Sequence, residues 1–449
     1  MLNKVTRLGS ARLAPPEASA DFVPRPRVTA LLDAAVARPL TLITGGPGTG
    51  KTDAVADWAR QNRGPGPVAW VGIDRAVRTA PRAWAAIIAS LNDALGEETL
   101  GGLHPPPAVD EYFIATLRDR LDGHDVVLVI DDVHEAVPDV LTGLDQLLHA
   151  PPEGLHTVLV SRHPPALSLN RHRLAGRLSE VRFDELAFTH EEVRPLAAKL
   201  GTVADDALLD DLQRVTGGWA AGLRLALLAM EGTDDPRGVL GSFNGAQPLV
   251  EGYLTEELER SLGSDLFDVL IRTCVTDRIN APLAIALTGD AGLSAQLWTR
   301  LGEAPLVAQL TDSGWFRYHP LLQQMLRSRL ERDDPALLAD LHSRAAAWFE
   351  RQGDAMTALD HAIDSGDAAL AVQVALRSAT VEFVVGDKTP LCRSIARIPP
   401  TGRRCERRCW HCGPSRPSVA AITRRRANWP PVPNPSSTHS RSRGAPSRW

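Results

Sequence analysis

Lysine and cysteine are both scarce in this sequence of 449 residues. Only four of its 49 basic residues are lysine, namely Lys4, Lys51, Lys199 and Lys388. It has five cysteines, and only Cys274 and Cys392 precede residue 401. So few cysteines exclude a disulfide framework and are typical of a reducing compartment. We therefore expect a cytoplasmic protein.

Long apolar runs are also lacking. The first residues, MLNKVTRLGSARLAPPEASADF, contain no apolar core of a signal peptide, and the most apolar later segment, WAAGLRLALLAM, is short and interrupted by Arg224. We therefore predict neither a signal peptide nor a membrane span. Hydrophobic residues make up 44% and charged residues 23% of the chain, as in ordinary globular proteins, and the length suggests about two to four domains.

Positive charge is concentrated at the end of the chain. Residues 401–449 hold eleven arginines and one acidic residue, Glu406, which leaves 38 basic and 53 acidic residues, a formal charge of −15, in residues 1–400. An acidic folded part is a poor candidate for binding nucleic acid across its whole surface. The arginines of the tail could bind phosphates weakly, although a solvated tail is the simpler interpretation.

Residues 40–183 alternate short apolar runs with stretches of helical periodicity. The runs LTLIT (40–44), VAWVGI (68–73), VVLVI (126–130), HTVLVS (156–161) and LSEVRF (178–183) predict strands. Residues 81–95 predict a helix with Trp84, Ile87, Ile88 and Leu91 on one face. This alternation is typical of a parallel sheet covered on both faces, and we predict an α/β P-loop domain.

After FDELAFTHEEV (183–193) the strand signals stop, and helical periodicity continues to about residue 395. In VTGGWAAGLRLALLAM, Gly217 and Gly218 predict a turn before an apolar stripe of Trp219, Leu223, Leu227 and Leu228. Residues 314–330 predict a short strand or turn that leads into a helix. Residues 341–376 predict three helices separated by Gly-Asp turns, as at the start of a helical-repeat array.

The segment GGPGTGKT fits the phosphate-binding pattern G-x-x-x-x-G-K-[ST] between a predicted strand and a predicted helix. Its glycines allow the backbone N–H groups to surround phosphates, the lysine reaches the β- and γ-phosphates, and the threonine hydroxyl binds Mg²⁺. The predicted nucleotide-binding residues are Gly45, Gly46, Pro47, Gly48, Thr49, Gly50, Lys51 and Thr52.

Polar residues follow two of the other predicted strands. Asp131 and Asp132 follow VVLVI, and downstream of a P-loop this pair predicts an Mg²⁺ site at Asp131, with Asp132 able to polarise the attacking water. A solvated turn or a helix cap is the alternative for such a pair. Arg162, after the fourth strand, could sense the γ-phosphate or lie solvated at the strand end. His134 is interpreted as a loop residue rather than a catalytic base.

Seven segments occur in the order and with the approximate spacing of one family. They are VPRPRV, GGPGTGKT, LVIDDVH, LVSRHPP, ELAFTHEEV, VTGGWAAGLRLA and WFRYHPLLQQMLRSRL, and they cover about residues 22–390. Together they resemble the MalT-type, ATP-dependent branch of the LuxR-family transcriptional regulators, within the signal-transducing STAND class of P-loop NTPases. Only the P-loop is specific by itself.

The resemblance implies a multidomain protein. Its expected parts are an N-terminal extension (1–21), a P-loop NTPase domain (22–188), a small helical domain (189–245), a winged-helix domain (246–335), the start of a TPR-like repeat array (336–396) and a disordered basic tail (397–449). By position, Val23 and Arg25 would border the adenine. His319 would reach from the winged helix to the β-phosphate and so lock an ADP-bound, closed state.

The segment from residue 397 departs from the family pattern, because it loses periodicity and becomes rich in Arg, Pro and Ser. We interpret it as a truncated or frameshifted end that lacks the family's DNA-binding helix-turn-helix. Cys405, Cys409 and Cys412 have the C-x3-C-x2-C spacing of an iron–sulfur ligand set, and His411 could join them around zinc. Only 37 residues follow Cys412, too few to build a fold around such a site, so metal binding is disfavoured.

Two classes of function remain open from the sequence. The first is a transcriptional regulator switched by ATP and ADP with Mg²⁺, with slow hydrolysis, self-association in the ATP state and an unknown small-molecule or protein inducer. It would contact DNA only through the missing domain. The second is an AAA-type ATPase that loads or remodels other molecules, which would need rapid turnover and an arginine finger from a neighbouring subunit. A small-molecule kinase is a weaker third possibility.

Overall fold

The computed structural model describes residues 13–385, except 75–76, 78, 107–108, 262–263, 291–292, 294–297, 299, 302–305 and 311–313, together with Arg397. The cysteine-rich segment and the rest of the predicted tail, apart from Arg397, lie outside these residues. Among the described helices, none is long and apolar enough to cross a membrane.

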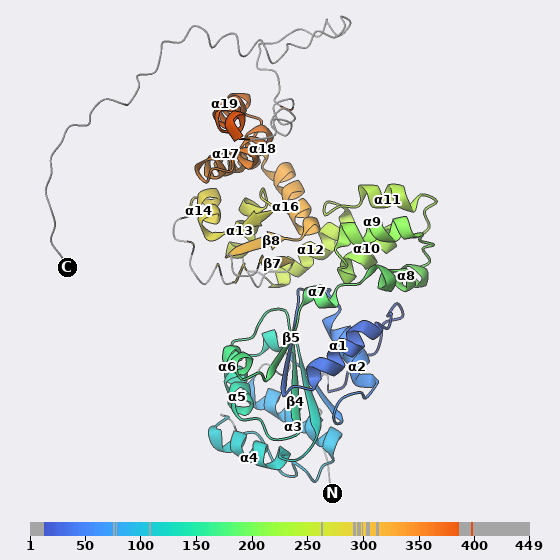
Figure 1. Ribbon diagram of the computed structural model, residues 1–449. Coiled ribbons are helices and arrows are strands. Elements are labelled where there is room, and N and C mark those ends of the chain that lie inside the picture. The colour runs from blue at the N-terminus through green and yellow to red at the C-terminus, as the bar shows by residue number, and fades with distance from the viewer. Residues whose placement is uncertain are drawn as a thin grey trace, which may run out of the picture. The chain divides into compact units, whose positions relative to one another are not determined.

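The first part of the chain forms a five-stranded sheet (Figure 1). Its strands are β1 (Leu40–Thr44), β2 (Val68–Gly72), β3 (Val126–Asp131), β4 (Leu155–Ser161) and β5 (Leu178–Val181). They lie in the order β2-β3-β4-β1-β5, and every neighbouring pair is parallel. The predicted α/β P-loop fold is confirmed.

Helices cover both faces of this sheet because successive residues of each strand point to opposite sides. Val127 and Val129 pack in one apolar cluster with α1 (Pro26–Val36) and α2 (Lys51–Arg60). Leu128 and Ile130 pack in another with α3 (Ala80–Leu95), α4 (Glu111–Leu121) and α5 (Pro138–His149). The predicted apolar face of α3 is buried, as expected.

Four of the five strands lie within one residue of their predicted bounds. The prediction for β5 was wrong at its end, because the strand stops at Val181 and Phe183 begins the short helix α7 (Phe183–Leu186). Asp184 and Glu185 lie in the first turn of α7, where the helix dipole favours acidic side chains. That local preference ends the strand early.

Four short helices follow, as predicted. They are α8 (His190–Lys199), α9 (Asp206–Thr216), α10 (Ala220–Met230) and α11 (Pro236–Ser242). Trp219, Leu223 and Leu227 are fully buried, but the fourth predicted stripe residue, Leu228, is 37% exposed. Leu228 lies nine residues beyond Trp219 and therefore on the opposite side of an α-helix, so its inclusion in the stripe was wrong.

The prediction of helical periodicity after residue 193 was only partly right. The short strand or turn expected in residues 314–330 is confirmed, but two further strands were not predicted from periodicity. A three-stranded antiparallel sheet, in the order β6-β8-β7, is formed by β6 (Arg278–Ile279), β7 (Val307–Leu310) and β8 (Trp315–Tyr318). Strands of two to four residues are too short to show an alternating pattern in the sequence. The helices around them are α12 (Pro248–Ser261), α13 (Ser264–Thr273), α14 (Ala281–Thr288) and α16 (Pro320–Asp333).

The predicted helix–turn–helix–turn–helix segment is confirmed. It forms α17 (Pro335–Arg351), α18 (Ala355–Asp364) and α19 (Ala368–Val385). Asp354 follows the turn glycine and accepts a hydrogen bond from the N–H of Thr357, which caps α18. The described elements belong to one compact unit.

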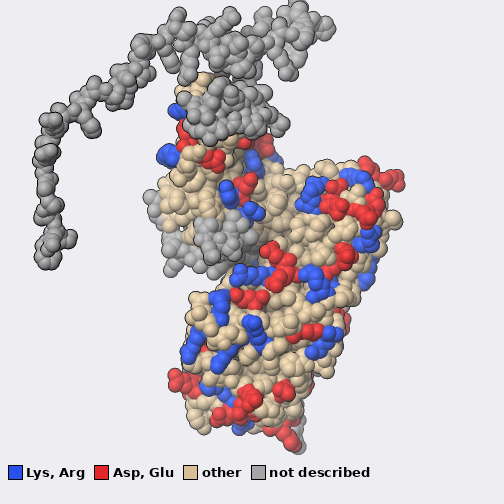
Figure 2. Space-filling model, in the orientation of Figure 1, with Lys and Arg blue, Asp and Glu red and all other residues tan. Residues whose placement is uncertain are grey.

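Charged side chains of both signs are interspersed on the face of the molecule shown in Figure 2. Neither sign forms a continuous band over the described residues on that face.

Candidate nucleotide-binding site

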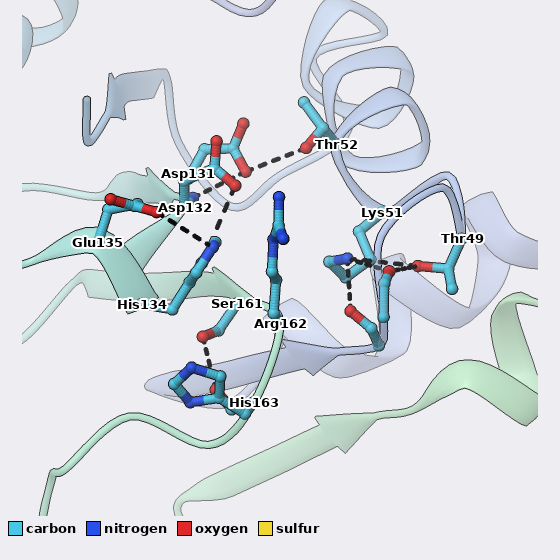
Figure 3. A network of polar contacts seen from close by, with 12 residues as sticks. Thr49, Lys51, Thr52, Asp131, Asp132, His134, Glu135, Ser161, Arg162 and His163 are labelled. Carbon is cyan, nitrogen blue, oxygen red and sulfur yellow. Dashed lines mark hydrogen bonds and ion pairs between the residues drawn. The ribbon is translucent and has the colours of Figure 1, made fainter. Parts of the chain in front are cut away.

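The carboxyl ends of three strands bring the main candidate residues together. The P-loop follows β1, Asp131 ends β3, and Arg162 follows β4, which lies between β1 and β3 in the sheet. Parallel strands end at the same edge, so these residues converge there. Figure 3 shows Arg162 reaching between the aspartate pair and Lys51.

Lys51 begins helix α2 and turns its ammonium group into the P-loop. Its Nζ donates to the carbonyl oxygens of Gly45 at 2.6 Å and Gly46 at 2.8 Å, and lies 3.3 Å from Oγ1 of Thr49. Burial, followed by the nearby charge of Arg162, lowers the pKa of Lys51 to about 8. At neutral pH the group is therefore still charged. A buried cation at a helix N-terminus favours an anion such as phosphate.

Two glycines give the loop its shape. Gly48 has a φ of +66° and Gly50 a φ of +77°, in the left-handed region that glycine tolerates best. Gly50 is the N-cap of α2, so its conformation turns the chain from the loop into the helix. The local geometry is that of a phosphate-binding loop.

Asp131 is 1% exposed and its carboxylate is held from two sides. Oδ1 accepts a hydrogen bond from Oγ1 of Thr52 at 3.1 Å and another from the N–H of Asp132 at 3.0 Å. Burial, followed by the charge of Asp132, raises the pKa of Asp131 to about 6. The carboxylate is thus mostly ionised at pH 7.

The oxygen donors of Thr52 and Asp131 fit Mg²⁺, which prefers oxygen ligands. Among the described residues, no group of three or more His, Cys, Asp or Glu side chains is arranged to hold a metal ion. A protein site with one carboxylate suits Mg²⁺ because this ion usually keeps several waters and binds substrate phosphates. The residues therefore fit a metal that arrives with a nucleotide.

Asp132 and His134 lie beside this carboxylate. Asp132 has a φ of +54°, and its side chain is 45% exposed. His134 lies in the short 3₁₀ helix η1 (Val133–Glu135), and its Nδ1 is 4.0 Å from Oδ1 of Asp132. Burial, followed by the charge of Arg162, lowers the pKa of His134 to about 3, so its ring is neutral at physiological pH. The predicted role of Asp132 in polarising water stays a prediction.

Arg162 contacts a residue far away in the sequence. Its Nη1 lies 3.3 Å from Oε2 of Glu257 in helix α12, and its side chain is 22% exposed. The guanidinium is also close enough to Lys51 and His134 to lower the pKa of both. Its predicted contact with a γ-phosphate stays a prediction.

A cavity of about 210 Å³ adjoins the P-loop. Val23, Arg25, Gly48, Gly50 and Phe188 are among its lining residues. The guanidinium of Arg25 lies 4.4 Å from the ring centroid of Phe188, and its Nη1 donates to the carbonyl of Leu186 at 2.5 Å. Val23 and Arg25 therefore line a cavity beside the P-loop, and their contact with adenine stays a prediction.

Helices α10 and α12 contact the P-loop directly, which the sequence did not indicate. Nε1 of Trp219 donates to the carbonyl of Pro47 at 3.0 Å, and the N–H of Ala221 donates to the carbonyl of Gly48 at 2.9 Å. A Cβ built on Gly48 would lie 2.6 Å from the hydroxyl of Tyr253. Trp219 was interpreted only as a core residue, because no motif reports a partner 172 residues away.

His319 lies at the start of α16, next to Trp219. Its Nδ1 accepts from the N–H of Leu321 at 3.3 Å, so its Nε2 is the protonated nitrogen and donates to the carbonyl of Thr216 at 3.1 Å. The ring centroid is 5.5 Å from that of Trp219, and burial lowers the pKa of His319. His319 thus contacts the end of α9, and its predicted contact with a β-phosphate stays a prediction.

Two family models match the chain. A model of the AAA ATPase domain matches residues 25–160, and a model of the MalT winged-helix domain matches residues 255–338. The first contains the P-loop, Asp131 and the strands that carry them. The second contains Glu257, the antiparallel sheet and His319.

Curated relatives share these regions. The chain is 30% identical to the serine/threonine-protein kinase PknK of Mycobacterium tuberculosis over 87% of its own length and 36% of the relative's. It is 27% identical to the HTH-type transcriptional regulator MalT of Klebsiella pneumoniae, again over 87% of its own length and 44% of the relative's. The chain thus spans less than half the length of these relatives.

A similar solved structure is the Walker-type ATPase PABY2304 of Pyrococcus abyssi. It matches 70% of this chain and 99% of that chain with a TM-score of 0.49 and 13% sequence identity.

Proposed function

Because this chain is a MalT-like protein with an AAA ATPase domain and a MalT winged-helix domain, we propose that it is a cytoplasmic regulator of transcription switched by nucleotide. ATP and ADP, with Mg²⁺, are its proposed ligands. ATP hydrolysis would be slow and would reset the switch.

The contact between the P-loop and the helical region carries this proposal. Trp219 and Ala221 donate to the carbonyls of Pro47 and Gly48, which belong to the loop that would surround the phosphates. A change in this loop on nucleotide exchange therefore changes the partners of α10. A nucleotide can shift such an equilibrium only by binding one state better, and about 5.5 kcal/mol moves a population from 1:99 to 99:1.

Each residue of the site has a proposed role. Lys51 neutralises the β- and γ-phosphates, Thr52 and Asp131 hold Mg²⁺, and Asp132 orients water toward the γ-phosphate. Bound Mg²⁺ would neutralise charge that develops on the phosphates. Arg162 would sense the γ-phosphate, and His319 the β-phosphate of ADP. Val23 and Arg25 would border the adenine.

The proposed domain bounds are those expected from the resemblance. They are 22–188 for the NTPase domain, 189–245 for the small helical domain, 246–335 for the winged-helix domain and 336–396 for the start of the repeat array. The ATP state would self-associate, and an unknown inducer would favour it. DNA recognition, which the name of the MalT relative indicates for that protein, is assigned to none of the described residues.

The experiment is to purify the chain, identify its bound nucleotide by ion-pair chromatography after denaturation, and measure turnover of ATP with Mg²⁺. A switch should retain about one ADP per chain and complete a cycle in minutes. A matched sample stripped of nucleotide and reloaded with ATP should slowly regain ADP.

Turnover of many ATP molecules per second with free exchange would contradict the switch and would favour the AAA-type loader or remodeller. Sequence-specific DNA binding by this chain at physiological salt would contradict the assignment of DNA recognition to other residues.

A further inference from the structure

Helix α12 presents two polar side chains to the candidate site. Tyr253 and Glu257 are four residues apart, so they lie on one side of the helix. The hydroxyl of Tyr253 would be 2.6 Å from a Cβ at Gly48, and Oε2 of Glu257 is 3.3 Å from Nη1 of Arg162. This side of α12 therefore touches both the P-loop and the end of β4.

Glu257 differs from the other glutamates near it in α12 because its side chain is buried. It is 7% exposed, whereas the adjacent Glu256 and the nearby Glu259 are both exposed. A buried carboxylate is costly unless a positive partner compensates it. Arg162 supplies that charge at the end of β4, between the strands that carry Lys51 and Asp131.

Glu257 also acts on the phosphate-binding lysine. Its charge raises the pKa of Lys51, and the charge of Arg162 lowers it, so the three groups share one electrostatic environment. An anion bound beside Lys51 would enter this environment. It would meet two cations that attract it and one carboxylate that repels it.

We propose that Glu257 sets the preference of the site for nucleoside diphosphate over triphosphate, by competing with the γ-phosphate for Arg162. This rests on the proposed nucleotide site. A guanidinium binds a carboxylate or a phosphate with the same planar set of donors, so one anion replaces the other. A diphosphate leaves the Arg162–Glu257 pair intact, and Glu257 then holds α12 against the site.

A triphosphate has the opposite effect. Its γ-phosphate engages Arg162 and leaves the carboxylate of Glu257 buried beside added negative charge. Because breaking a buried ion pair by removing one partner is strongly destabilising, α12 must move away to return Glu257 to water. Glu257 is thus a specificity-determining residue that acts through Arg162.

The test is to measure the Kd values of Mg·ATP and Mg·ADP for the full chain by calorimetry, in the wild type and in Glu257→Gln. The variant keeps the size of the side chain and removes its charge. We expect the ratio of ATP to ADP affinity to rise about tenfold, within the range of ordinary coupling between sites. Glu256→Gln is the matched control, because it removes the same charge from an exposed neighbour, and its ratio should match the wild type.

A second measurement separates this role from a general loss of packing. Arg162→Gln should weaken ATP more than ADP, and adding Glu257→Gln to it should leave the ratio unchanged, because the two residues act as a pair. Circular dichroism and thermal unfolding identify any variant that fails to fold, and Glu257→Asp, which keeps the charge, should then keep a ratio near the wild type.

The proposal is overturned if both nucleotides bind and Glu257→Gln has the same affinity ratio as Glu256→Gln, a result that leaves the nucleotide site itself intact. If the wild type binds neither nucleotide, the proposed function fails together with this inference.

Discussion

The ATPase domain and the helical region after it both contain buried charged or polar side chains, but their partners differ. Lys51 and Asp131 are held by groups of the ATPase domain itself. Lys51 donates to the P-loop carbonyls of Gly45 and Gly46, and Asp131 accepts from the hydroxyl of Thr52. Glu257 is paired instead with Arg162 on a distant element. Local motifs thus position the groups proposed to bind phosphate, whereas tertiary packing positions the groups proposed to respond to it.

The largest effect is expected from Lys51→Ala. Removing this ammonium takes away the charge at the centre of the P-loop, so the affinity for both ATP and ADP should fall about 100-fold or more, as expected for a charge-assisted contact in a buried site. Calorimetry on the folded variant measures it. Lys199→Ala is the control. Lys199 is exposed, and its ammonium group donates a hydrogen bond to the carbonyl of Phe22.

Affinities within tenfold of the wild type for Lys51→Ala would place the phosphates elsewhere. The proposal that the P-loop motif positions the phosphate-binding groups would then be wrong.

Asp131→Asn should separate binding from hydrolysis. The amide keeps the shape of the side chain but loses the charge that holds Mg²⁺, so Mg²⁺-dependent turnover should fall about 100-fold while nucleotide without metal still binds. Chelating Mg²⁺ in the wild type should reproduce the loss. Wild-type turnover in Asp131→Asn would remove Asp131 from the metal site.

The wild-type turnover should also fall with acidification. Because the pKa of Asp131 in the metal-free site is raised to about 6, a proton competes with Mg²⁺ for this carboxylate below that pH, so turnover at limiting Mg²⁺ should decrease. A rate that is flat from pH 7 to pH 5 would contradict this role.

The helical region should lose stability in acid through a histidine pair. Nδ1 of His342 lies 2.9 Å from Nδ1 of His361, and burial, followed by the charges of His361 and Arg327, lowers the pKa of His342 to about 3. Burial also lowers the pKa of His361, while Asp277, Asp360 and Asp364 oppose the shift. An unfolded histidine binds its proton near pH 6.5, so stability is full above that value and is lost as the pH falls toward the native pKa.

One such histidine should lower the free energy of unfolding by about 2 kcal/mol between pH 7 and pH 5. Urea unfolding at both pH values measures the loss. His342→Leu should reduce the difference between the two pH values, whatever its own effect on stability. An unchanged difference would show that this pair is not the titrating group.

The smallest effect is expected from Trp219→Phe. This change keeps an aromatic ring in the core and removes the hydrogen bond to Pro47, which is worth about 1 kcal/mol. Release of ADP should therefore become about fivefold faster, as measured by stopped flow with a fluorescently labelled nucleotide. Trp348→Phe, in α17 and away from the P-loop, is the control.

Equal release rates in the wild type and Trp219→Phe would mean that the contact of α10 with the loop is not coupled to the nucleotide. The P-loop and helix α10 would then act independently.

The sequence by itself determined the parallel sheet and the half of the candidate site that is proposed to bind phosphate. The buried strands are apolar runs that need no distant information to be identified, and four of the five were predicted within one residue. Lys51, Thr52 and Asp131 were found because a P-loop and a strand-end acid have a fixed local chemistry. Strand β8 was predicted as a short strand or turn before a helix, whereas β6 and β7 were missed, because strands of two to four residues show no alternation.

Only the tertiary structure decided which side chains of the helical region face the loop. Trp219 has the apolar spacing of a core residue, and its core position is correct, but its Nε1 also needs an acceptor, which Pro47 supplies from 172 residues away. Glu257 resembles the exposed Glu256 in sequence, and only the tertiary structure, which brings Arg162 to Glu257, buries one and leaves the other in water. Periodicity records how apolar a face is, whereas a polar contact depends on two surfaces that meet only when the chain has folded.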